Sequence, residues 1–111
     1  MKVLLDHNVP TKLRRHLTSH AVRTVQEMLW QQLENGDLLT AAEIAGFEVI
    51  VTADQNLSYQ QNLTGRKFGL VVLGTNDWNI LKLDPNPVTA AVDRAKPGSF
   101  ELVGFENQGR Q

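Results

Sequence analysis

The sequence contains no cysteine and no apolar run long enough to cross a bilayer. Without cysteine the chain has no disulfide framework, no thiolate metal site and no cysteine nucleophile. This composition fits a reducing compartment, and we expect a cytoplasmic protein. The apolar run at residues 3–5 ends at Asp6, far short of a signal-peptide core or a membrane span, so we expect no membrane association.

The sequence also lacks an excess of charge of either sign, because 11 Lys and Arg residues oppose 12 Asp and Glu residues for a net charge of −1. A global positive field that captures nucleic acid is therefore excluded, and any nucleic acid must be held by a local patch. One candidate patch comprises Lys12, Arg14, Arg15 and His16. A solvated helix face is the more common explanation of such a run.

The remaining composition is that of a packed globular domain, with 41% hydrophobic and 21% charged residues in a chain of 111. A length in this range favours one domain over residues 1–111. No internal repeat, low-complexity stretch or linker divides the chain.

Short apolar runs separated by turn residues predict strands that alternate with helices. The expected strands cover residues 3–5, 21–25, 47–52, 68–73 and 100–103. One expected helix follows Pro10, a second runs from 35–37 to Gly46, a third follows Asn56, and the last is capped by Asn86-Pro87. Because the strand at 68–73 is apolar throughout and the strand at 47–52 is nearly so, we expect an α/β fold with a mainly parallel sheet of about five strands and helices on both faces.

Two aspartates directly follow predicted strands: Asp6 comes after the first strand and Asp54 after the central one. In open parallel sheets, ligands bind outside the carboxyl ends of the strands. Asp6 and Asp54 share this edge if their strands are neighbours. Two like charges held close together need a cation to neutralise them, and hard oxygen ligands select Mg²⁺ or Mn²⁺. We therefore expect a metal site there, although strand-end aspartates also serve as turn formers and caps.

A third acid lies at a predicted helix start. Asp37 follows Asn35-Gly36, where the partial positive charge of a helix N-terminus favours an ionised carboxylate. Asp37 is a candidate third ligand or a plain helix cap. Glu43 lies six residues later, which is about 240° around a helix, so the two acids cannot easily serve one site. We prefer Asp37 and keep Glu43 as the alternative.

The histidines form no convincing site. His16 and His20 have the i, i+4 spacing of a helical metal pair, but His20 is expected beyond the helix end and no acidic partner accompanies them. A solvated face explains them better. His7 either contacts substrate or fills a loop. Covalent hydrolase chemistry is unsupported, because the sequence has no Gly-rich phosphate loop, no GxSxG and no serine placed beside a histidine and an acid.

Three segments resemble motifs of the small PIN-like proteins related to VapC-type toxin nucleases. LLDHNVP at 4–10 resembles the LLDEN-P opening, VTADQNL at 51–57 the TxDxDF segment, and NGDLLTAAEIAGF at 35–47 the middle helix of that family. The resemblance covers most of the chain through about residue 73. It implies a three-layer α/β/α sandwich and an acidic site that binds Mg²⁺ or Mn²⁺ for RNA hydrolysis. The matching catalytic acids are Asp6, Asp37 and Asp54.

The chain departs from the family pattern at two positions. His7 stands where the opening motif usually has glutamate, and Asn56 where the second aspartate of TxDxD is often found. Asn56 can still ligate a metal through its amide oxygen or a water, but it adds no charge to hold a second ion. The resemblance implies Asp6 and Asp54 as direct ligands and Asp37 as a direct or water-mediated ligand.

The expected function is a metal-dependent ribonuclease, the toxin component of a toxin–antitoxin pair. Asn8 and Asn56 are expected to orient water or substrate, and Lys12 and Arg15 are candidate phosphate contacts. The expected substrate is RNA, and an antitoxin protein and a second copy of the chain are further candidate partners. The main alternative is a PIN-like binding module that has lost turnover and interacts with an antitoxin or another protein.

A second alternative is a response-regulator receiver, which also uses acids after its first and third strands. Thr75 and Lys96-Pro97 fit that pattern superficially. However, the Lys-Pro pair precedes the last predicted strand instead of ending it, and Asp6 has no second acid beside it. We rank the receiver third.

Overall fold

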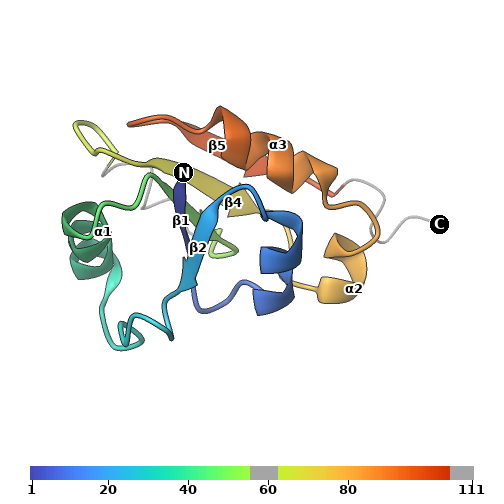
Figure 1. Ribbon diagram of the computed structural model, residues 1–111, viewed down its shortest axis with the longest axis horizontal. Coiled ribbons are helices and arrows are strands. Elements are labelled where there is room, and N and C mark those ends of the chain that lie inside the picture. Colours follow the sequence, from blue (N-terminus) through green and yellow to red (C-terminus); the bar gives the residue numbers. More distant parts are fainter. Residues whose placement is uncertain (56–62, 106–111) are drawn as a thin grey trace.

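The structure, a computed structural model, describes residues 1–55 and 63–105. Its five strands form one sheet in the order β2-β1-β3-β4-β5 (Figure 1). The strands are β1 Lys2–Leu5, β2 Ala21–Thr24, β3 Val49–Thr52, β4 Gly69–Leu73 and β5 Phe100–Val103. Every adjacent pair is parallel, which confirms the expected parallel sheet of about five strands.

Helical segments cover both faces of this sheet (Figure 1). They are the 3-10 helix η1 Thr11–His16 and the α-helices α1 Asn35–Ile44, α2 Trp78–Leu81 and α3 Asn86–Arg94. Successive side chains of a strand point to opposite faces. Accordingly Val3 and Leu5 enter a core shared with η1, α2 and α3, whereas Leu4 enters a second core shared with α1. The result is a three-layer α/β/α sandwich.

Burial of the strands follows their place in the sheet. Every residue of β3 and β4 is buried, as expected for central strands with helices on both faces. The edge strand β2 alternates between exposed and buried residues. Continuous apolar runs therefore predicted the central strands well. Among the described residues, α1 is the longest helix with ten residues, and no helix has the length and apolarity that crossing a bilayer requires.

The helical segments differ from the prediction in three places. The helix after Pro10 is a 3-10 helix, with Leu13 N–H bonded to the Pro10 carbonyl at 3.1 Å, although Leu13 and Leu17 are buried as expected. The short helix α2 was not predicted, and its start is capped by Asp77, whose carboxylate accepts the Asn79 N–H at 2.9 Å.

The third difference concerns α3, in which Asn86 is the first helical residue and Pro85 precedes it as the N-cap. The expected cap at Asn86 is therefore wrong by one position. A proline one residue further in, Pro87, suits the first turn because its missing N–H would have no partner there. The helix expected after Asn56 lies outside the described residues.

Gly69 at the start of β4 provides a test of how closely β4 packs on the turn before β5. A Cβ at Gly69 would lie 2.8 Å from the Lys96 carbonyl oxygen and 2.5 Å from the Ser99 hydroxyl. We expect Gly69→Ala to lower the free energy of unfolding by about 1–3 kcal/mol, measured by urea denaturation. The control Gly36→Ala has nothing within 4 Å of the added methyl, so it should be neutral or slightly stabilising. Equal losses in the two variants would contradict this packing.

Candidate active site at the carboxyl ends of the strands

Asp6 and Asp54 lie at the ends of two neighbouring strands. β1 pairs with β3 in parallel, with Leu5 opposite Val51, and the Asp6 N–H donates to the Val51 carbonyl at 2.9 Å. The strands that precede the two acids are therefore neighbours, which is the condition for the acids to share one edge of the sheet. Both acids follow central strands at the edge where a parallel sheet binds ligands.

The Asp6 side chain is buried, with 3% of its surface exposed. A buried carboxylate is costly unless hydrogen bonds replace its lost water. Two donors do so here. The His7 backbone N–H donates to Asp6 Oδ1 at 2.8 Å, and the Thr52 hydroxyl donates to Asp6 Oδ2 at 2.8 Å. The ring Nδ1 of His7, on a mostly exposed side chain, lies 3.1 Å from the same Oδ1.

Thr52 connects the two acids. Its hydroxyl, which donates to Asp6, also accepts the Asp54 N–H at 3.1 Å. Next to it, Asn8 Oδ1 accepts the Ala53 N–H at 3.0 Å. The loops after β1 and β3 are thus held together by two side chains. Neither role was predicted, although a threonine two residues before an aspartate is a typical local hydrogen-bonding pattern.

Asp37 occupies an exposed position in the first turn of α1. Asp6 and Thr52 continue the alternation of Leu4 and Ile50, so they point to the same face of the sheet as α1. Nevertheless, no three His, Asp or Glu side chains of the described residues are grouped closely enough to hold a metal ion. Asp37 therefore does not form such a group with the two strand-end acids. Asn56 lies outside the described residues.

Glu43 lies at the other end of α1 and holds the chain that leads into β4. Its Oε1 accepts from Arg66 Nη1 at 2.8 Å and its Oε2 accepts the Lys67 N–H at 2.8 Å. The Lys67 N–H, and then Arg66, hold the pKa of Glu43 below its ordinary value of 4.5. Because these partners precede β4, Glu43 is at the amino ends of the strands. Glu43 therefore lies at the opposite ends of the strands from Asp6 and Asp54, and Asp37 remains the preferred candidate.

Among the basic residues that follow Asp6, Arg14 forms an ion pair with Glu27, whereas Lys12 and Arg15 are exposed. Arg14 Nη2 donates to Glu27 Oε1 at 2.5 Å, and Glu27 and Thr24 exchange two hydrogen bonds of 3.0 Å in a capping box. The pKa of Glu27 is lowered, first by the Arg14 hydrogen bond. In contrast, Lys12 and Arg15 are exposed on η1 and remain available for phosphate contacts.

His20 is a structural residue, so its predicted place on a solvated face is wrong. Its side chain is 7% exposed, and its Nε2 lies 2.8 Å from Asp93 Oδ1 of α3. Its Nδ1 lies 3.1 Å from the amino group of Met1. Sequence spacing could not reveal this acidic partner, because Asp93 is 73 residues away and is brought close only by packing.

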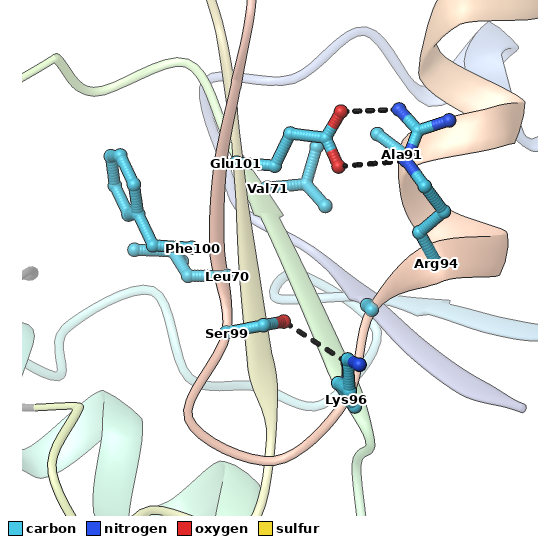
Figure 2. A pocket seen from close by; sticks show the side chains of 9 residues that line it. Leu70, Val71, Ala91, Arg94, Lys96, Ser99, Phe100 and Glu101 are labelled. Atoms are coloured by element: carbon cyan, nitrogen blue, oxygen red, sulfur yellow. Dashed lines mark hydrogen bonds and ion pairs between the residues drawn. The ribbon is translucent and has the colours of Figure 1, made fainter.

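A cavity of about 320 Å³ lies at the amino ends of the strands, opposite the acids. It is formed between α3 and the first residues of β4 and β5. Figure 2 shows Arg94 reaching from α3 to Glu101 on β5, and the Ser99 hydroxyl bonded to the Lys96 N–H. The Glu101 carboxylate raises the pKa of Arg94. Lys96 is thus far from the acids that follow β1 and β3, which removes the lysine that a receiver would need.

Comparison of the chain with protein-family models, curated proteins and solved structures found no match. The resemblance to PIN-like nucleases therefore stays a prediction from the motifs.

The hydroxyl of Thr52 offers the most direct test of that geometry. Thr52→Val keeps the shape but leaves Asp6 Oδ2 and the Asp54 N–H without their partner, so we expect a loss of about 1–3 kcal/mol in urea denaturation. Thr89→Val is the matched control, because its hydroxyl makes only an exposed contact to the His16 carbonyl at 3.2 Å and a partly buried one to the Pro85 carbonyl at 3.4 Å. We expect that variant to lose less than about 0.5 kcal/mol. A similar loss in both would show that Thr52 has no special role.

The lowered pKa of Glu43 predicts how stability depends on pH. A carboxyl whose pKa is lower in the folded state adds stability above its unfolded pKa, and this stability is lost as pH falls through the folded pKa. Wild type should therefore be more stable than Glu43→Gln at pH 7, and the difference should shrink as pH falls below 4.5. Urea denaturation across this range measures it. A difference that grows on acidification would contradict the assigned contacts.

Proposed function

We propose that this protein is a PIN-like, metal-dependent ribonuclease, the toxin component of a toxin–antitoxin pair, and that Asp6 and Asp54 are its principal catalytic acids. One observation supports this most strongly. A buried carboxylate, Asp6, is connected through Thr52 to the backbone of a second acid on the neighbouring central strand. Keeping a charged group buried at a sheet edge is costly for stability, which is typical of a functional site.

The donor set is suited to Mg²⁺ or Mn²⁺. Proteins usually bind Mg²⁺ through one or two carboxylates, with waters and substrate phosphates as the remaining ligands. Asp6 Oδ2 accepts one hydrogen bond from Thr52, and a carboxylate oxygen has a second lone pair to offer. A bound ion would neutralise charge on the scissile phosphate and lower the pKa of a water.

The chain's own residues would position the reactants. Thr52 and the His7 N–H fix the orientation of the Asp6 carboxylate, and Asn8 fixes the loop before Asp54. Asn8 Oδ1 accepts the Ala53 N–H, and its amide NH₂ would contact the substrate. Exposed Lys12, one short loop after Asp6, would contact a phosphate of the RNA together with Arg15. Asp37, at the start of α1, would bind through water.

A second candidate is a PIN-like module that binds an antitoxin or another protein without turnover. The contact of the His7 ring with Asp6 Oδ1 favours it, because the ring occupies an oxygen that an ion would use. The lack of a three-residue acidic group among the described residues also favours it. The two candidates differ in whether RNA is cleaved.

A cleavage assay on mixed single-stranded RNA with Mn²⁺ or Mg²⁺ tests the proposal. We expect Asp54→Asn, which keeps the side-chain shape, to reduce cleavage by about 100-fold or more because a charged group at the reacting phosphate is lost. Asp84→Asn is the matched control: it makes the same chemical change at an exposed position whose carboxylate accepts the Asn86 N–H at 3.3 Å, and it should cleave like wild type.

The melting temperature in millimolar Mn²⁺ separates the two candidates. An ion that binds only the folded protein raises the melting temperature of wild type and of Asp84→Asn, but not of Asp54→Asn. A rise without cleavage of any RNA would identify the binding module. If there is neither a rise nor cleavage, the metal-dependent nuclease is rejected.

A further inference from the structure

An aromatic pair lies on the same edge of the sheet as the acids. The rings of His16 and Trp78 are 5.9 Å apart between centroids and are tilted by 33°. His16 is the last residue of η1 and Trp78 the first of α2, which lie side by side in Figure 1. The Thr89 hydroxyl donates to the His16 carbonyl at 3.2 Å, which holds the end of η1 in place.

Trp78 is only partly covered by the protein. It packs against the core that contains Leu81, yet it keeps part of its surface exposed, and His16 beside it is exposed. Asn76 and Asn79, on either side of Trp78 in the sequence, are also exposed. A partly exposed indole thus lies beside an exposed imidazole, with exposed asparagines around the pair.

This surface is close to the proposed active site. Trp78 follows β4, and β4 is the second strand along from β1 in the sheet. Neighbouring strands are about 4.8 Å apart, so the ends of β1 and β4 are separated by roughly 10 Å. Lys12 and Arg15 are exposed on the same short helix as His16. The aromatic pair and the cations thus lie on the η1 face of the carboxyl edge, whereas the Asp6 carboxylate points to the α1 face, so an RNA strand that reaches both must cross the ends of the strands.

We propose that Trp78 and His16 form a stacking platform for a base of single-stranded RNA, with Lys12 and Arg15 binding the adjoining phosphates. This inference rests on the proposed function, because it assigns the RNA's path past Asp6. Aromatic faces bind unpaired bases by stacking whatever their sequence, and cations beside them bind the backbone. A protein with a net charge of −1 needs such a local surface, because it has no global attraction for RNA.

The two tryptophans of the chain make the platform directly measurable. Trp30 contacts Phe47 edge to face, at 6.0 Å between ring centroids, and is partly buried against the core on the α1 face, away from the His16 and Trp78 pair. In Trp30→Phe, Trp78 is therefore the only indole. Titration with an eight-nucleotide oligouridine in EDTA, where metal-dependent cleavage cannot occur, should quench the emission of Trp30→Phe to saturation. The emission of Trp78→Phe, which reports Trp30, should stay unchanged.

Anisotropy of a labelled oligouridine gives the affinity in the same buffer. We expect Trp78→Ala to weaken binding by about 5- to 150-fold, as for the loss of one stacked base, and Trp30→Phe to bind like wild type. Single-stranded DNA of the same length should also quench Trp78, since stacking does not need the 2′-hydroxyl. Duplex RNA should not, because its bases are stacked on each other.

The inference is overturned if wild type fails to bind the oligouridine, if the emission of Trp30→Phe stays constant while wild type binds, or if Trp78→Ala binds as tightly as wild type. Its failure can be told from failure of the nuclease proposal. Cleavage without quenching of Trp78 rejects the platform alone. Quenching of Trp78 without cleavage under any metal supports the platform and rejects the nuclease.

Discussion

The hydrogen bond between the Thr52 hydroxyl and Asp6 Oδ2 is the contact on which the carboxyl edge of this sheet depends. Asp6 follows a strand whose last three residues are completely buried, so its carboxylate has lost almost all its water. The donors from Thr52 and from the His7 backbone replace that water. Since Thr52 also accepts the Asp54 N–H, the interaction that stabilises one acid fixes the backbone of the other.

The two edges of the sheet differ in what their charged residues do. At the amino edge, Glu43 binds the segment before β4, and the Arg94–Glu101 ion pair lies beside the 320 Å³ cavity. These charges are paired with each other and hold α1 and α3 to the sheet. At the carboxyl edge, Asp6 is satisfied mainly by uncharged donors, and Lys12 is exposed. Parallel strands all end at this edge, which is why groups from different parts of the chain meet there.

An overall charge near zero means that recognition by this protein depends on short-range contacts. A stacking surface at Trp78 and His16 needs no net positive charge, and two exposed cations on η1 can bind only a few phosphates. The acids repel RNA unless a cation neutralises them, so metal binding and substrate binding would support each other at this edge. Under the proposed function, the aromatic pair would hold the RNA strand while the acids act on it.

The sequence by itself determined the α/β class, the parallel sheet and the positions of its strands, because short, nearly continuous apolar runs such as 47–52 and 68–73, alternating with helix signals, are typical of strands covered on both faces. It also indicated Asp6 and Asp54, because polar residues that end such runs must lie at the sheet edge. It did not reveal the role of Thr52, the Asp93 partner of His20, or the approach of His16 to Trp78. Those contacts join residues 46, 73 and 62 positions apart, and only the strand order and the packing of η1 on α2 and α3 bring them together.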